Sequence, residues 1–232
     1  PQDYLIQIRK RRIETIKAFK MGFSDSYPNL YTELIAKGFT KDEIDAARIW
    51  VPDGLFVFFY HHPRTKDIVH FNTKNPFRVH MKRGDDVDPD PIEGFSAGPK
   101  ILLYTPNFSF KNPVIIVEGE HDLASVFESG YTNAACLGGR VTNETLGILE
   151  KCEAEIYTAF DNDEVGRKYL STLNELFPEK IIRQIQFPER YKDIDEFYTN
   201  EPENFNINTL MLTSVAIPTD GFKVKHSGNI WE

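Results

Sequence analysis

Residues 113–197 alternate between short apolar runs and helical patterns, and this alternation constrains the fold more than any other feature of the chain. The runs Val114–Val117, Ile156–Phe160 and Ile181–Phe187 are rich in β-branched and aromatic residues, and acidic residues follow each of them. A strand–helix–strand order is typical of a parallel sheet with helices on both faces. The carboxyl ends of parallel strands share one edge, where ligands bind. We therefore predict an α/β domain whose acidic residues meet at one edge.

Four acidic residues are expected to converge at that edge: Glu118, Asp161, Asp163 and Asp193. Two carboxylates about 4 Å apart repel by roughly 4 kcal/mol at an effective dielectric constant near 20. Such groups must be protonated, turned into water or bridged by cations. Carboxylate oxygens suit Mg²⁺ or Mn²⁺, with phosphate oxygens in the remaining positions. For any single acid the alternative is an exposed helix N-cap, but the set together favours a metal site.

The acidic residues fall into three blocks: EGEHD (118–122), DNDEVGR (161–167) and KDIDE (192–196). Their order resembles a TOPRIM domain, in the variant found in DnaG-type primases and in the primase halves of phage primase–helicases. A fourth similarity is Ala134–Gly139, where such primases carry a strand that ends in a Ser-Leu-Gly turn. Cys136 stands here in place of the Ser.

The resemblance implies a DNA primase catalytic core of phage or plasmid type, which synthesises short RNA primers on single-stranded DNA from NTPs. It implies two or more Mg²⁺ or Mn²⁺ ions and a replicative helicase as partner. The expected catalytic residues are Glu118, Asp122, Asp161 and Asp163, and the expected metal ligands are Glu118, Asp161, Asp163, Asp193 and Asp195. Glu118 is a candidate ligand or general acid/base, and Asp122 is a candidate for orienting Glu118 or joining the metal ligands.

Two basic residues of the acidic blocks, Lys192 and Arg167, are candidates for binding nucleotide phosphates. An ion pair between Asp163 and Arg167, four residues apart on one helix, is the alternative for Arg167.

The first half, residues 1–112, is predicted to be a smaller, basic α+β subdomain, and the resemblance implies that it guides the template. One helix is expected over Tyr4–Phe19, and its basic run Arg9–Arg12 is interpreted as a solvated face or a phosphate contact. Strands are expected at Leu55–Tyr60, Ile68–Phe71, Phe77–Met81 and Ile101–Tyr104, in one small antiparallel sheet. By position alone, the template-binding candidates are Lys74, Arg78, Lys82, Arg83 and Lys100. For each of them an ordinary basic residue on the surface is the alternative.

Residues 113–200 are predicted to be the TOPRIM catalytic domain, and residues 201–232 a C-terminal extension or linker.

Residues 1–112 carry 17 Lys and Arg against 14 Asp and Glu, whereas residues 113–232 carry 10 against 21. This asymmetry is unlike that of a simple DNA-coating protein. It suits a protein that holds phosphates on one half and metal-binding carboxylates on the other.

Several classes of protein are excluded or disfavoured by what the sequence lacks. Cys136 and Cys152 have no CxxC spacing, so neither a disulfide framework nor a zinc site is indicated. No apolar run approaches the roughly 20 residues of a membrane span, so we expect no membrane association and a cytoplasmic location, bacterial or that of a phage's host. No GxxxxGK[ST] signature occurs, which argues against a helicase motor or an ATPase-linked nuclease.

Two alternatives to a primase stay open at this point. The same acidic set can cleave phosphodiester bonds, so the chain can be a TOPRIM nuclease. It can also be a silent module that only binds nucleic acid or a replication partner, although all the acids are present. The helical and aromatic segment that precedes the acidic blocks favours the primase.

Overall fold

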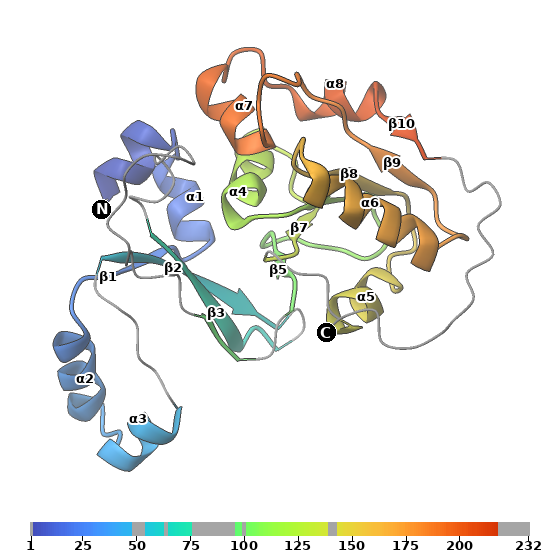
Figure 1. Cartoon of the computed structure of the whole chain (residues 1–232). Coiled ribbons are helices and arrows are strands. Elements are labelled where there is room, and N and C mark those ends of the chain that lie inside the picture. The colour runs from blue at the N-terminus through green and yellow to red at the C-terminus, as the bar shows by residue number, and fades with distance from the viewer. Residues whose placement is uncertain are drawn as a thin grey trace.

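The computed structural model describes residues 2–47, 54–62, 65–75, 96–98, 101–138 and 143–217. Within them the chain forms two sheets, a four-stranded one in the first half and a six-stranded one in the second. Figure 1 shows the smaller sheet beside the larger one, with α2 and α3 projecting away from both.

The first half consists of short elements around an antiparallel sheet. Its helices are a π-helical turn (Tyr4–Ile8), α1 (Ile13–Ala18), α2 (Tyr27–Ala36) and α3 (Lys41–Ala47). Its strands are β1 (Gly22–Ser24), β2 (Leu55–His61), β3 (Ile68–Lys74) and β4 (Ser96–Ala97), in that spatial order. A capping box starts α3, since Thr40 Oγ1 accepts from the Glu43 backbone N–H at 3.2 Å while the Glu43 carboxylate accepts from the Thr40 backbone N–H at 2.7 Å.

The second half contains the predicted parallel sheet. Its strands are β5 (Leu103–Tyr104), β6 (Val114–Val117), β7 (Ala134–Cys136), β8 (Ile156–Ala159), β9 (Ile182–Gln184) and β10 (Val215–Ala216). Its helices are α4 (Glu120–Glu128), α5 (Asn143–Leu149), α6 (Glu164–Leu176), α7 (Ile194–Asn200) and α8 (Ile207–Leu212). The spatial order is β10-β9-β8-β6-β7-β5, with β6 to β9 parallel and the two outer strands antiparallel.

Helices cover both faces of this sheet because its central strands are apolar on both sides. On β6, Ile115 and Val117 pack with α4, α7 and α8, whereas Val114 and Ile116 pack with α5 and α6. All four side chains are fully buried. The uninterrupted apolar run thus gives a strand that is buried on both faces, as expected for a parallel sheet.

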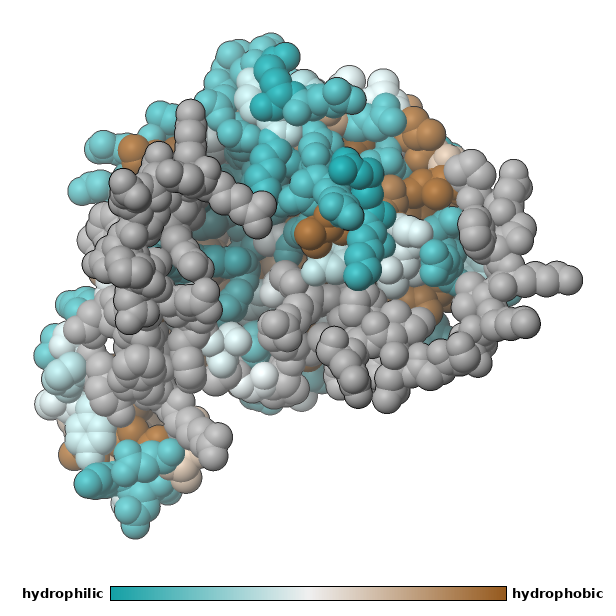
Figure 2. Space-filling model, viewed as in Figure 1, coloured by the Kyte–Doolittle hydropathy of each residue, from teal (hydrophilic) through white to brown (hydrophobic). Residues whose placement is uncertain are grey.

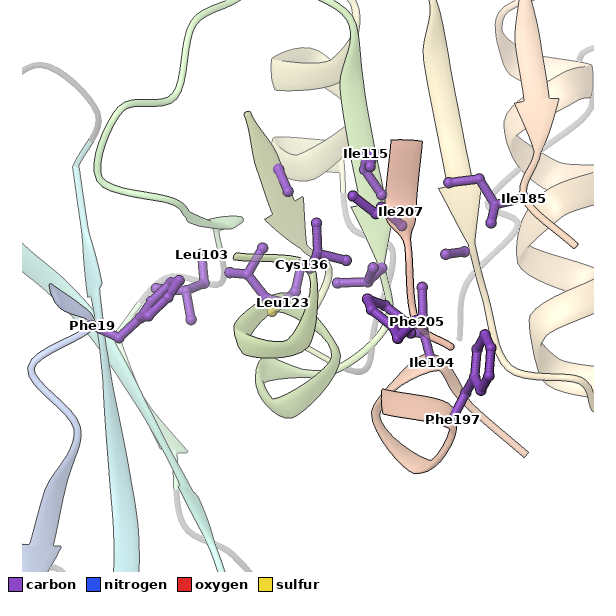
Figure 3. Packing of buried hydrophobic residues seen from close by; sticks show 14 of the residues in the cluster. Phe19, Leu103, Ile115, Leu123, Cys136, Ile185, Ile194, Phe197, Phe205 and Ile207 are labelled. Atoms are coloured by element: carbon purple, nitrogen blue, oxygen red, sulfur yellow. The ribbon is translucent and has the colours of Figure 1, made fainter. Parts of the chain in front are cut away.

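One core runs from the first half into the second. Phe19 and Leu103 lie beside Leu123 and Cys136, and the same cluster continues to Phe205 (Figure 3). The described surface in Figure 2 is mostly hydrophilic, with hydrophobic residues gathered near β9 and β10. None of the helices in the described ranges has the length and apolar character needed to cross a bilayer.

The structure corrects three expectations. Leu103 and Tyr104 do not join the small sheet, because they pair antiparallel with Cys136 and Ala135 in the larger one. The C-terminal segment is not merely an extension, since β10 adds a strand beside β9. The predicted strand Phe77–Met81 lies outside the described residues.

The third correction concerns the predicted helix Tyr4–Phe19, which is broken in the middle. Lys10 adopts a left-handed conformation with φ 54°. The π-helical turn ends before it and α1 starts only at Ile13. This break turns Arg11 and Arg12 toward the second half, where they bind carboxylates of α7 and α4.

Candidate active site

The site lies at the carboxyl ends of β6 and β8, which are neighbours in the sheet. From β6 the chain continues into α4 on one face, and from β8 it continues into α6 on the other. This is a topological switch point, where parallel α/β sheets open a crevice for ligands. Glu118 follows β6 and Asp161 follows β8, and Glu118 Oε1 accepts a hydrogen bond from the Asp161 backbone N–H at 2.9 Å.

A pocket of about 340 Å³ opens at this point. Its lining contains six acidic side chains and three basic ones, so the pocket carries a surplus of carboxylates. The acidic residues are Glu118, Glu120, Asp122, Asp161, Asp193 and Asp195, and the basic ones are Arg9, Lys74 and Lys192.

Four of these acids, Asp122 among them, hold their protons more tightly than ordinary carboxyls. Burial, and then the charge of Asp161, raise the pKa of Glu118 to about 7. Burial, and then the charge of Asp195, raise the pKa of Asp193 to about 6. Burial also raises the pKa of Asp161, although the Lys192 ammonium pairs with its Oδ2 and opposes that shift. The positive charge of the pocket therefore does not neutralise these carboxylates fully.

The acids at the helix starts are also fixed by backbone hydrogen bonds. Asp163 accepts from the Gly166 N–H at 3.0 Å and Asp193 from the Glu196 N–H at 2.7 Å, so both are N-caps, as the alternative interpretation expected. Asp122 accepts from the N–H groups of Gly119 and Asp195. Burial and the nearby Asp193 raise the pKa of Asp122.

Gly166 lets α6 approach the site closely. A Cβ atom there would lie 2.2 Å from the Asp161 carbonyl oxygen and 2.9 Å from Glu118 Oε1. Only glycine leaves room for this contact, which explains the glycine in the second acidic block.

Asp195 differs from the predicted metal ligand. Its Oδ1 accepts from Arg11 and from Ser125 Oγ, and its Oδ2 pairs with Arg9. Burial would raise the pKa of Asp195, but Arg11, His121, Arg9 and the hydrogen bond from Ser125 together hold it well below its usual range. Both carboxylate oxygens of Asp195 are thus bound by arginines of the basic run Arg9–Arg12. At Arg11 this run is therefore neither a solvated face nor a phosphate contact.

The donor set fits a hard divalent cation. In the described ranges no three His, Cys, Asp or Glu side chains are already arranged around one point as ligands. However, Glu118, Asp161 and Asp193 offer only oxygen atoms, and their pKa values are raised by burial and by neighbouring carboxylates. These three residues are the ones that could hold Mg²⁺ or Mn²⁺.

Comparison with known proteins agrees with this geometry. Residues 115–198 match the family described as Toprim-like. A DNA primase of Campylobacter jejuni is 35% identical over 63 residues, which are 27% of this chain and 10% of that protein. The primase of Aquifex aeolicus, in a structure of its zinc-binding and RNA polymerase domains, superimposes with a TM-score of 0.70 at 20% identity over 90% of this chain and 54% of that one.

Two further solved structures cover almost the whole chain. The DnaG catalytic core superimposes with a TM-score of 0.69 at 17% identity, over 93% of this chain and 72% of that one. The DnaG primase catalytic domain bound to ssDNA gives 0.69 at 16% identity, over 93% and 74%. The chain has a Toprim-like domain in the fold of a DnaG-type primase core. It spans about half of the Aquifex chain and a tenth of the Campylobacter protein.

The remaining predicted residues of the Toprim-like domain lie outside the pocket. Asp163 caps α6 and is not among the lining residues. Arg167 is exposed on α6, and it forms no ion pair with Asp163 although both residues are described. Of the five template-binding candidates, Lys74 lines the pocket, and the other four, Arg78, Lys82, Arg83 and Lys100, lie outside the described residues.

Four lining residues are absent from the sequence-based set, namely Gly119, His121 and the two charged residues Arg9 and Glu120. Arg9 lies in a basic run that sequence patterns assign to a surface. Glu120 lies inside the first acidic block, two residues after Glu118. Its position in that block is the signal by which the sequence could have identified it as a site residue.

Proposed function

We propose that this chain is the catalytic core of a DNA primase, a nucleotidyltransferase that builds short RNA primers on single-stranded DNA. One observation supports this above the others. Carboxylates that follow three parallel strands line one pocket, and the basic residues Arg9, Lys74 and Lys192 line it with them. That combination suits triphosphates and divalent ions, and it occurs in a fold shared with DnaG cores.

In nucleotidyl transfer, a 3′-hydroxyl oxygen bonds to the α-phosphorus of an incoming nucleotide, and the bond to the bridging oxygen breaks to release pyrophosphate. The barrier comes from aligning two anions and from charge on the phosphoryl oxygens. Divalent ions supply charge neutralisation and lower the pKa of the attacking hydroxyl. Glu118, Asp161 and Asp193 would hold such ions in this chain.

The other side chains have electrostatic and proton-transfer roles in this proposal. Instead of holding an ion, Glu118 can take the proton of the hydroxyl near neutral pH, because its pKa without metal is about 7. Lys192, after β9, and Lys74, at the end of β3, both line the pocket, and in this proposal they bind phosphate oxygens. Asp122 fixes the backbone N–H groups of Gly119, next to Glu118, and of Asp195. Asp163 caps α6, and Arg167 is exposed on α6 outside the pocket.

Incubation with single-stranded DNA, NTPs and Mn²⁺ tests the proposal, with Asp161→Asn as the control. New short RNA that is absent with the variant supports a primase. Shortened DNA instead indicates a nuclease, and a gel shift without any product indicates a binding module, and either result contradicts the proposal. A replicative helicase partner and a cytoplasmic location remain predictions.

A further inference from the structure

Glu120 is a buried carboxylate at the wall of the acidic pocket, and the proposed chemistry gives it no role. Its side chain is fully buried. Oε1 accepts from Tyr60 Oη and from Asn72 Nδ2, each at 2.6 Å, and Oε2 lies 3.2 Å from Lys74 Nζ. All three partners belong to β2 and β3 of the small sheet, whereas Glu120 begins α4 of the Toprim-like domain.

The hydrogen bonds leave Glu120 little freedom to reorient. Tyr60 is buried and packs edge-on against His70, with ring centroids 4.9 Å apart. The Gly138 backbone, with φ 63°, lies so close to the Tyr60 hydroxyl that a Cβ atom there would be 2.5 Å from it. Burial and these close neighbours restrict the Tyr60 hydroxyl, which in turn donates to Glu120 Oε1.

Lys74 has the opposite character, because it is the last residue of β3 and its side chain is 38% exposed. A lysine side chain has a flexible four-carbon stem, and without a fixed partner its ammonium group samples many positions. Glu120 Oε2 supplies that partner at the wall of the pocket. Lys74 lines the pocket beside Asp161 and Asp193, so its remaining N–H donors can point into it.

We infer that Glu120 is a positioning residue, which holds the Lys74 ammonium group where it binds a phosphate group of the substrate. This inference rests on the proposed function, because it assumes that phosphates enter this pocket. The phosphate belongs either to the incoming nucleotide or to the template strand, and the experiment distinguishes the two.

Glu128 provides a matched control on the same helix. It ends α4 eight residues later, its side chain is also fully buried, and it also pairs with a cation of the first half, Arg12. Arg12 does not line the acidic pocket. Glu128 therefore shares the burial and the ion pair of Glu120 without the contact to the site.

The test compares Glu120→Gln, Lys74→Met, the double variant and Glu128→Gln. We measure the Kd of ATP with Mn²⁺ by calorimetry, the Kd of a fluorescent single-stranded DNA oligonucleotide by anisotropy, and the Tm. Lys74→Met should weaken one ligand about tenfold, Glu120→Gln should weaken the same ligand similarly, and the double variant should be no weaker than Lys74→Met. Glu128→Gln should lower the Tm without changing either Kd.

Loss of ATP affinity assigns the phosphate to the nucleotide, and loss of DNA affinity assigns it to the template. The inference is overturned if Lys74→Met weakens neither ligand, if Glu120→Gln binds both like wild type, or if the two losses add in the double variant. If Glu120→Gln fails to fold, Tyr60→Phe replaces it. We then expect a smaller loss of affinity for the same ligand, and unchanged affinity for both ligands would contradict the inference. If the wild-type protein binds ATP but makes no RNA, the primase proposal is contradicted, whereas the test of Glu120 and Lys74 by ligand affinity still applies.

Discussion

Two walls of the same pocket carry carboxylates that differ in what neutralises them. On the wall that faces the first half, Asp195 pairs with Arg9 and Arg11, and Glu120 pairs with Lys74. The Lys74 ammonium and hydrogen bonds from Tyr60 and Asn72 outweigh burial and lower the pKa of Glu120 to about 2. At the carboxyl ends of the strands, Glu118 and Asp193 instead have pKa values of about 7 and 6.

This contrast separates two roles for acids that come from the same sequence blocks. A buried carboxylate with its own cations joins two parts of the fold and has no free oxygen for a ligand. A carboxylate that lacks a full counter-charge is stabilised when a cation from solution binds. We therefore expect Asp195 on the first wall to affect stability, Glu120 on that wall to affect ligand binding through Lys74, and the strand ends to affect metal binding and catalysis.

The largest expected effect is on catalysis. Asp161→Asn or Asp161→Ala should abolish primer synthesis, with a loss of at least about a hundredfold, because it removes a cation ligand at the switch point. The Tm should stay close to that of wild type, since Asp161 is not part of the core. Asp42→Asn on the exposed helix α3 is the control, and a variant of Asp161 with normal turnover would remove the metal assignment.

The next effect is on stability. Asp195→Asn should destabilise the protein by about 3–5 kcal/mol, because the buried Arg11 guanidinium loses its charged partner. Urea unfolding at neutral pH measures this value. Asp193→Asn, two residues away, should leave the stability unchanged or raise it, since its charge is not favoured in the folded state. Equal losses for the two variants would contradict the distinction between the walls.

Metal affinity should depend on pH. Glu118 and Asp193 must lose their protons before they bind a cation, so Mn²⁺ affinity should increase from about pH 5 to about pH 8. Titration with Mn²⁺ at constant ionic strength checks this, and Glu118→Gln should flatten the profile. An affinity that does not change over that range is incompatible with carboxyls of raised pKa at the site.

Stability without metal should show the opposite trend for the strand ends. The pKa of Glu118 is about 7 in the folded state against an ordinary 4.5. Its contribution to the free energy of unfolding is therefore present at low pH and is lost as the pH rises through that interval. The pKa of Glu120 is lowered from 4.5 to about 2, so its contribution is lost as the pH falls through that interval. The urea midpoint of Glu118→Gln should therefore depend less on pH than that of wild type near neutral pH. The midpoint of Glu120→Gln should depend less on pH than that of wild type at acid pH. A Glu118→Gln profile identical to that of wild type would contradict the raised pKa.

The smallest effect concerns template binding. Affinity for single-stranded DNA should fall as salt rises if the first half contacts phosphates, and removal of one contact lowers the slope of log K against log salt by about 0.7. Lys74→Met is the variant to test, with Lys41→Met on α3 as the control. A response that is flat from low to moderate salt argues against the first half as the template guide.

Much of the fold was predictable because the parallel strands are continuous apolar runs. The runs Val114–Val117 and Ile156–Phe160 are each followed directly by an acid, and the rule that strand ends share one edge brings Glu118 and Asp161 together. The outer strand β5 was assigned to the wrong sheet, because two residues carry no periodicity that could distinguish one sheet from another. Only the long-range pairing of Leu103 with Cys136 decides it.

The roles within the site were less predictable, since they depend on partners that are distant in sequence. Asp193 and Asp195 are two residues apart, and nothing local shows that one faces the pocket while the other binds Arg11, 184 residues away. The buried position of Arg11 depends in turn on the left-handed Lys10, which breaks a pattern that otherwise reads as one helix.

Mn²⁺ binding by wild type, Asp161→Asn and Asp163→Asn, measured near pH 8 from the free-ion paramagnetic signal, tests the central claim most directly. The claim is that the strand ends of β6 and β8 together bind divalent ions. We predict that wild type binds Mn²⁺, that Asp161→Asn loses this binding, and that Asp163→Asn, which alters only a helix cap outside the pocket, retains most of it. Equal Mn²⁺ binding by wild type and Asp161→Asn would contradict the claim.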